Sequence, residues 1–391
     1  MWLKRFLAEQ FPDAIVESLT TAPDLEHSFS GLYVRGRMRD GPRTWAVLAV
    51  SPSENAAAVE GVLASGVLWL DWTRSHMERQ AVEGIRLFVP EGASRVVSLR
   101  ALGLSPAART EIFEFHERDS WMRRVDCADA GNLESWLVPH QEAESSIEAA
   151  RRAIARIHPL ALHLLPAGDD ISVRSVSQLG EVALCFRGLE FGRWSPEGIS
   201  FGLGDARQRL SDATEPTLDA LMRELDTYRS PNASDANHPL YRAGPERWIE
   251  TLVLQDPARL DAQLDPRHFY SQVPALAAGD RGVIDLLGVT RRGRLVVIEL
   301  KASEDIQLPM QAVDYWLRVR RHQRDGDFER CGYFVGAPPD PRPPLVWLVA
   351  PALRFLSATE TLLKYLSPEI QVTRIGLNEN WRRGLKVVFR Q

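Results

Sequence analysis

Apolar and polar residues alternate in a way that divides the last third of the chain into helices and strands. Residues 245–264 predict a helix with proline in its first turn and a second short helical stretch. The aliphatic stretches 281–290 and 293–302 are joined by Arg-Arg-Gly, a combination that predicts a β-hairpin. A helix with proline near its start and two buried strands are expected next, at 308–324, 331–337 and 345–351. This order predicts an α/β domain in three layers.

The first hundred residues show a similar order of elements. A hairpin, a helix and a strand are predicted at 30–38 with 44–51, at 55–76 and at 84–91. The similarity leads to the hypothesis of a duplicated fold whose N-terminal copy has lost its chemistry. Aligning 51–55 with 301–305 places Ala49 at the position of Glu299 and Ser51 at that of Lys301. The alternative is that hairpin, helix and strand simply form a common order in α/β proteins.

Two stretches mark domain boundaries near residues 142 and 238. One, at 138–153, is a polar entry into a helix, and the other, at 228–246, is rich in turn-forming residues and lacks periodicity. Between them lie strands at 180–194 and 198–204 and a helix at 217–229. The expected fold class is therefore α/β in three parts. They are an N-terminal α/β domain at 1–142, a middle α+β module with a linker at 143–238, and a C-terminal α/β domain at 239–391.

Composition adds a charge asymmetry to this picture. The net charge of −5 divides into +6 for residues 281–391 and −11 for residues 1–280, so the C-terminal part is suited to a polyanion, unless the clustering is chance. Only four of the 47 basic residues are lysines, and Lys301 ends an apolar strand two residues after Glu299. Three cysteines without CxxC spacing argue against a disulfide framework or a zinc site. The same cysteine usage makes a reducing cytoplasm the expected location. No apolar run is long enough to span a bilayer, so no membrane partner is expected.

Asp285, Glu299 and Lys301 are expected to converge at the end of the C-terminal hairpin. Strand side chains alternate between faces, so Glu299 and Lys301 point to one side, and strand pairing brings Asp285 beside them. Burying three charges is costly unless they are paired or hold an ion. Two carboxylates and the carbonyl of Leu300 suit Mg²⁺ or Mn²⁺, with waters and a substrate phosphate completing the shell. A lysine here is suited to holding or deprotonating a water molecule.

This D-x13-E-x-K pattern, on a hairpin followed by a helix, resembles the PD-(D/E)XK nuclease superfamily. Gln311 and Tyr315 form Q-x-x-x-Y on that helix, similar to the extra motif of RecB-type exonuclease domains, and their i,i+4 spacing puts both on one face. The stretches 246–264 and 282–302 resemble the C-terminal catalytic domain of the archaeal and actinobacterial NucS/EndoMS mismatch endonucleases. There too a helix bearing glutamate precedes the hairpin.

The resemblance covers residues 243–336 and implies a restriction-endonuclease-like three-layer fold. Either Glu246 or Glu250 would supply the helix acid, and we favour Glu250. Ile284 replaces the proline that conventionally precedes the first aspartate. The first 240 residues do not resemble the NucS N-terminal DNA-binding domain, so mismatch specificity is not implied.

The implied activity is that of a divalent-metal-dependent nuclease, with DNA favoured over RNA and endonuclease over exonuclease, acting in repair or defence. Asp285 and Glu299 would hold Mg²⁺ or Mn²⁺, and Lys301 would position the attacking water. The supporting residues would be Glu250, Gln311 and Tyr315. Basic residues near the site would contact phosphates without reading sequence. The candidates are Arg281, Arg291, Arg292, Arg318 and Arg321.

Several alternatives stay open at this point. One alternative to the nuclease is a non-catalytic nucleic-acid-binding or interaction protein with a vestigial site. Another is a defence nuclease that is gated by an N-terminal sensor. Gln311 and Tyr315 are otherwise ordinary core positions, and Glu304 and Asp305 are expected to be a solvated helix start. The N-terminal segments would contribute substrate selection or a homodimer contact, since cutting two strands usually needs two sites.

Overall fold

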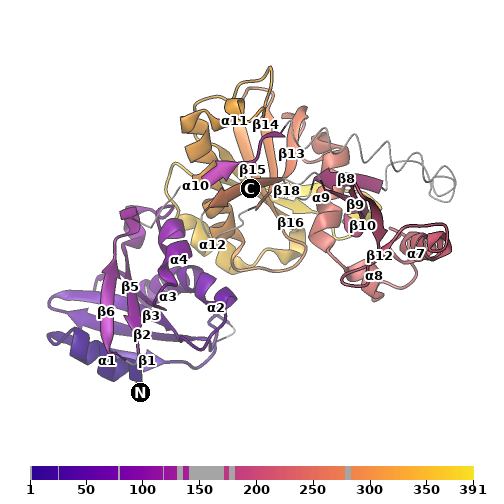
Figure 1. The fold of residues 1–391 in the computed structure, drawn as a ribbon. Coiled ribbons are helices and arrows are strands. Elements are labelled where there is room, and N and C mark those ends of the chain that lie inside the picture. The colour runs from indigo at the N-terminus through magenta and orange to yellow at the C-terminus, as the bar shows by residue number, and fades with distance from the viewer. Residues whose placement is uncertain are drawn as a thin grey trace.

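The computed structural model has a mixed α/β architecture, and its described strands form three β-sheets (Figure 1). The structure describes residues 2–24, 26–77, 80–117, 119–129, 135–140, 171–175, 181–277 and 283–391. Arg281 and most of the predicted helix entry at 138–153 therefore lie outside the described residues. No helix within these ranges is long and apolar enough to cross a membrane.

The N-terminal sheet has six strands that lie side by side in chain order. They are β1 (Ala14–Thr20), β2 (Tyr33–Asp40), β3 (Arg43–Val50), β4 (Val82–Pro90), β5 (Thr110–His116) and β6 (Trp121–Val125). β1 to β3 are antiparallel, β3 to β5 are parallel, and β6 is antiparallel to β5. The predicted hairpin is the β2–β3 pair, where Gly41 supplies the positive φ of +57° that the tight turn requires.

Helices cover both faces of this sheet. They are α1 (Trp2–Gln10), α2 (Ala56–Glu60), α3 (Val62–His76) and α4 (Ser94–Ala101). Leu3, Phe6 and Leu7 of α1 pack on one face, whereas α3 and α4 pack on the other. The single helix predicted at 55–76 is divided at Gly61, where a Cβ would lie 2.4 Å from the hydroxyl of Tyr33.

The middle module is a five-stranded antiparallel sheet with a helix against it. Its elements are β8 (Ile171–Ser175), β9 (Val182–Phe186), β10 (Leu189–Ser195), β11 (Gly198–Phe201), β12 (Gln208–Arg209), α7 (Glu215–Tyr228) and α8 (Pro239–Arg242). The β9–β10 turn lies against the C-terminal domain, because a Cβ at Gly188 would come within 2.2 Å of the Arg247 carbonyl. Buried Arg229 donates to the carbonyls of Arg187, Leu240 and Ala243, which holds the linker to that turn.

The C-terminal sheet has seven strands in the order β18-β17-β16-β15-β14-β13-β7. The strands are β7 (Ser135–Leu137), β13 (Leu264–Ala277), β14 (Val283–Thr290), β15 (Leu295–Leu300), β16 (Leu345–Pro351), β17 (Gln371–Leu377) and β18 (Val387–Arg390). The helices are α9 (Pro245–Gln255), α10 (Leu308–Asp325), α11 (Asp327–Arg330) and α12 (Ser357–Lys364). β7 pairs with β13 although it precedes the predicted boundary at residue 142, so the two outer parts of the chain share this sheet.

The strand predicted at 331–337 is wrong. These residues form turns, and Gly332, Phe334 and Gly336 have positive φ values of 76°, 55° and 79°, a repetition within five residues that breaks an extended strand. Tyr333 and Phe334 are nevertheless buried in the cluster that α10 and α11 cover. Burial of aromatic side chains by successive turns produces the same apolar pattern as a buried strand.

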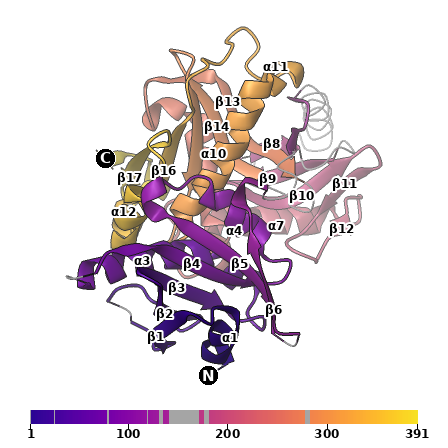
Figure 2. The same ribbon diagram turned by 90° about the vertical axis from the view of Figure 1, so that its left-hand side faces the viewer.

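The N-terminal and C-terminal sheets share one topology. From β13 to β18 the strands lie in chain order, with β13 to β15 antiparallel, β15 to β17 parallel and β18 antiparallel, as in β1 to β6. Along the chain, α10 connects the third and fourth strands of the C-terminal sheet, and α3 connects the third and fourth strands of the N-terminal sheet. In the same way, α12 and α4 lie between the fourth and fifth strands of their sheets. Different strand orders would have excluded the duplication hypothesis, and the observed orders agree. Figure 2 shows the N-terminal sheet at the bottom, with α3 and α4 on the side toward α10 and α12 and α1 on the far side.

Candidate active site

The β14–β15 hairpin brings Asp285 and Glu299 together. Leu286 pairs with Ile298 at the end of the antiparallel register, so one further step along both strands brings Asp285 opposite Glu299. The backbone N–H of Leu300 donates to Oδ2 of Asp285 at 3.2 Å, which ties the carboxyl to the end of β15. The Glu299 residue is only 3% exposed. Two carboxyl groups therefore share a largely dry strand end.

Lys301 lies beside both this carboxyl pair and the start of α10. Its Nζ is 3.5 Å from Oε1 of Glu299 and 3.3 Å from Oδ2 of Asp305. Asp305 was expected only as a solvated helix start. It does accept a hydrogen bond from the N–H of Gln307 at 2.7 Å, one residue before α10 begins, but it also holds the lysine. Asp305 is thus a site residue that the sequence pattern did not single out.

Burial sets the protonation of these groups. It raises the pKa of Glu299 well above its ordinary value, and the negative charge of Asp285 adds to the effect. Burial also raises the pKa of Asp285. For Lys301, burial lowers the pKa, but the charges of Glu299 and Asp305 outweigh it, so the pKa lies above its ordinary value. Lys301 is therefore an ammonium ion at neutral pH, which suits it to holding a water or phosphate oxygen rather than deprotonating a water.

Helix α9 supplies a third carboxyl group to the site. Glu250 is 5% exposed and accepts at Oε2 from Nη1 of Arg247 at 2.8 Å and from Nε2 of Gln272 at 2.9 Å. The same Gln272 amide lies 3.4 Å from Oδ1 of Asp285, so it bridges the two acids. Burial raises the pKa of Glu250, against the charge of Arg247. Glu246, the alternative acid, instead accepts from the N–H of Ala302 at 3.2 Å and holds the segment that follows β15.

Gln272 is the main site residue that the sequence pattern missed. It lies in β13, a strand that was not predicted, because Pro274 two residues later disfavours an interior strand. Its φ of +51° is unusual for a residue with a side chain, and such strain tends to persist where the surrounding structure requires it. The strained backbone and the bridging amide together mark Gln272 as a positioning residue for Glu250 and Asp285.

Gln311 and Tyr315 lie on α10, the helix that faces this side of β15. Burial raises the pKa of the Tyr315 phenol, and the charges of Glu299 and Asp285 raise it further, so the phenol lies within electrostatic reach of both acids. Tyr315 also packs at the edge of the cluster formed by Leu295 and Val297, so it contributes to the core as well. Tyr315 can therefore be a core residue and a site residue at the same time.

Two buried oxygen atoms at the site lack hydrogen-bond partners within the described chain. They are Oε2 of Glu299 and Oε1 of Gln311. A buried acceptor without a donor is costly, and an unpaired carboxylate oxygen is the kind of atom that a hard cation binds. The described residues contain no group of three or more His, Cys, Asp or Glu side chains arranged to hold a metal by themselves. The donor set fits a Mg²⁺-type ion that draws its other ligands from water and substrate phosphate.

The arginines expected at the nucleic-acid surface are scattered. Arg291 and Arg292 lie at the β14–β15 turn, at the opposite end of β15 from Glu299, and the Nε of Arg291 donates to the Ala262 carbonyl at 3.0 Å. Arg318 is 5% exposed and its Nε donates to Asp314 at 2.8 Å, so it is a structural ion pair rather than a phosphate contact. Arg321 lies on α10 and its Nε is 3.5 Å from Asp325.

Arg247 is better placed than any of these to meet a phosphate at the site. Its side chain is 38% exposed, while Nη1 contacts the buried Glu250. The charge of Arg174, on the middle module, also acts on Glu250. The middle module therefore brings a positive charge close to Glu250. The sequence pattern could not predict this, because it depends on how the middle module packs against the C-terminal domain.

No family model matches the chain, and no curated protein matches it. Among solved structures the chain is similar to one described as a complex of EndoMS with dsDNA2, at 15% identity and a TM-score of 0.21, over 54% of this chain. The match spans 66% of the EndoMS chain, just under two thirds. A TM-score this low does not establish a common overall fold.

Proposed function

We propose that the chain is a divalent-metal-dependent nuclease that hydrolyses phosphodiester bonds, with DNA favoured over RNA and endonuclease over exonuclease. The supporting observation is the buried carboxyl pair of Asp285 and Glu299, with one oxygen unpaired among the described groups, beside the ammonium group of Lys301. Two acids and a cation gathered at a strand end are costly to bury and serve no packing role. With a divalent cation held between the carboxyl groups and a phosphate oxygen, this arrangement would accept a phosphodiester, which the two acids alone would repel.

The residues of the site divide the work as follows. Asp285 and Glu299 would hold Mg²⁺ or Mn²⁺, which would activate water and offset negative charge on the phosphate. The carbonyl of Leu300, between the Glu299 and Lys301 side chains, stays a predicted third ligand. Lys301, held by Asp305 as well as Glu299, would position the attacking water and stabilise charge that develops on the phosphate. Gln272 and Glu250 would fix the orientation of Asp285.

The second candidate is a non-catalytic nucleic-acid-binding protein that keeps a vestigial site. The two are separated by incubating plasmid, single-stranded DNA and RNA with the purified chain and Mg²⁺, Mn²⁺ or EDTA. Cleavage that needs metal and is lost in Lys301→Ala, but kept in the exposed control Lys386→Ala, supports the enzyme. If wild type and Lys301→Ala behave alike on every substrate, the enzyme proposal fails.

A further inference from the structure

The two outer domains pack against each other through equivalent elements. α3 of the N-terminal domain contacts α12, and α10 of the C-terminal domain contacts α4. In the shared topology α3 corresponds to α10 and α4 corresponds to α12. Each domain therefore contacts the other through the same pair of helices. This reciprocity is what a two-fold axis produces between two copies of one protein. Here the two copies lie within one chain.

The backbone repeats the reciprocity at the centre of the contact. Leu104 and Leu366 form an antiparallel bridge just beyond the ends of α4 and α12. The N–H of Ser105 donates to the Tyr365 carbonyl at 2.8 Å, and the N–H of Ser367 donates to the Gly103 carbonyl, also at 2.8 Å. The two bonds are equivalent under an exchange of domains, so the local axis passes between the two leucines.

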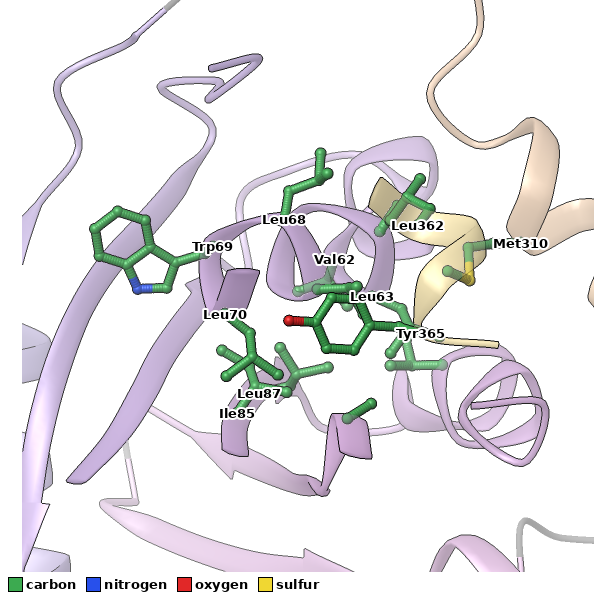
Figure 3. Packing of buried hydrophobic residues seen from close by; sticks show 14 of the residues in the cluster. Val62, Leu63, Leu68, Trp69, Leu70, Ile85, Leu87, Met310, Leu362 and Tyr365 are labelled. Atoms are coloured by element: carbon green, nitrogen blue, oxygen red, sulfur yellow. The ribbon is translucent and has the colours of Figure 1, made fainter. Parts of the chain in front are cut away.

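The side chains at this contact form one core rather than two surfaces in loose contact. Figure 3 shows Leu63 and Leu68 of the N-terminal domain with Met310, Leu362 and Tyr365 of the C-terminal domain in a single buried cluster. Polar contacts cross it from both long helices. Asp71 of α3 accepts from the Tyr365 hydroxyl at 3.0 Å, and Asp314 of α10 lies 3.8 Å from Nε of Arg100. The α10–α12 surface of the C-terminal domain is therefore occupied within its own chain.

The N-terminal copy has an apolar core where the other copy has its acids. Leu48 and Val50 belong to the cluster under α3, whereas Ala49 belongs to the one under α1. Since Glu299 lies on the α10 side of β15, the sequence alignment that paired it with Ala49 is shifted by one residue. Two residues of β3 face the same side as Glu299: Leu48, which pairs with Arg35, and Val50, which pairs with Tyr33. Val50 ends β3 as Glu299 lies next to the end of β15, so we take Val50 and Tyr33 as the counterparts of Glu299 and Asp285.

No pair of buried carboxyl groups remains at this second site among the described residues, and the acid whose charge acts on Tyr33 is the partly exposed Glu54, just after β3. The Tyr33 hydroxyl donates to the Ala58 carbonyl at 2.7 Å and is thereby engaged in the core. On the other face of the sheet, α1 takes the place of α9 and presents Phe6 and Leu7 rather than glutamates. The N-terminal copy thus has the fold of a partner but lacks the carboxyl pair and the lysine that define the site in the other copy.

We propose that the N-terminal domain is a built-in partner without a site, which fills the surface through which a second catalytic domain would dock, so that one chain cuts one strand per encounter. The proposal rests on the proposed nuclease function and names its mode of action. A monomer would nick a duplex, and a double-strand break would need two separate encounters. The homodimer expected from two-strand cutting is replaced by a pseudo-dimer within the chain.

The test is a time course on supercoiled plasmid in excess over the full-length chain, with Mn²⁺, at a concentration where light scattering shows a monomer. The expected result is that open-circular plasmid accumulates first and linear plasmid appears only after most molecules are nicked. Linear product that forms from the start, without a preceding open-circular stage, would overturn the single-site proposal while leaving the nuclease proposal intact. Absence of metal-dependent cleavage, or equal cleavage by Lys301→Ala, would overturn both.

Discussion

Nζ of Lys301 lies 3.5 Å from Oε1 of Glu299, while Oε2 of the same carboxyl group is buried and has no hydrogen-bond donor within the described structure. One oxygen is thus held by a cation and the other is left open. This asymmetry is unfavourable for a folded protein and favourable for binding a metal ion. Several consequences can be measured.

Replacing Glu299 by glutamine is expected to stabilise the metal-free protein at pH 8. The pKa of Glu299 is raised in the folded state, so the folded protein binds this proton more tightly than the unfolded chain does. That contribution to stability is complete below the unfolded pKa, near 4.5, and is lost as the pH rises through the folded pKa. Glutamine cannot ionise, so the variant does not lose this stability as the pH rises, and Asp305 still pairs with Lys301. We therefore expect the free energy of unfolding at pH 8 to increase by about 1–3 kcal/mol.

Urea unfolding at pH 5 and pH 8 measures this effect. The advantage of Glu299→Gln over wild type should shrink toward the lower pH, because the wild-type carboxyl is then protonated. A variant that is less stable than wild type at pH 8, or an advantage that does not change with pH, would contradict the assignment of Glu299 as a strained buried acid.

Mn²⁺ is expected to raise the unfolding temperature of the wild-type protein, and EDTA should reverse the rise. An ion that binds only the folded state adds about 2.7 kcal/mol at one hundred times its dissociation constant. Asp285→Asn should lose this gain, whereas Asp256→Asn, at a partly exposed position outside the site, should keep it. Because Glu299 must release its proton to bind metal, the gain should diminish as the pH falls. Equal gains in all three proteins would show that Mn²⁺ binds elsewhere.

Two substitutions at Gln272 distinguish the effect of backbone strain on stability from the effect of the side-chain amide on activity. Both Gln272→Gly and Gln272→Ala remove the amide that bridges Glu250 and Asp285, so both should lower the cleavage rate about tenfold or more through misplacement of Asp285. Only glycine relieves the φ of +51°, so the glycine variant should be about 1 kcal/mol more stable than the alanine variant. Thermal unfolding and initial rates report the two effects. Full activity in either variant would rule out the positioning role.

Gly103→Ala tests the contact between the two outer domains. A Cβ at this position would lie 2.2 Å from Cγ1 of Val313 on α10, so the substitution should cost about 1–3 kcal/mol of stability. The neighbouring Leu102 is 37% exposed, and Leu102→Ala should change stability by less than about 0.5 kcal/mol. Denaturant unfolding of the two variants compares them directly. Equal stabilities would mean that the domains do not pack closely at Gly103.

Local patterns were sufficient to predict the elements that carry the acids. The β14–β15 hairpin follows from aliphatic strands around a turn with Gly293 at a φ of +83°, and α10 begins at Leu308 as expected. Both signals lie within short stretches of chain, where periodicity and turn-forming residues are informative. The α/β class and the similar order of the two outer segments could be predicted for the same reason.

Features that depend on distant contacts could not be predicted. Arg318 had the pattern of a surface arginine on a charged helix, but α10 lies between its own sheet and the N-terminal domain, so Arg318 is buried against Asp314. Gln272 belongs to a strand whose pairing with β14 compensates for the nearby Pro274. The occupied domain surface depends on both copies of the fold at once, and no single stretch of sequence contains that information.

The most direct test of the central claim is the initial rate of Mn²⁺-dependent phosphodiester cleavage by wild type and Lys301→Ala, measured beside their affinity for the same oligonucleotide. We expect the variant to bind with similar affinity and to cleave about 10²–10³-fold more slowly, since it lacks a charge needed only as the reaction proceeds. Equal rates, or no cleavage by the wild-type protein on any nucleic acid, would contradict the account.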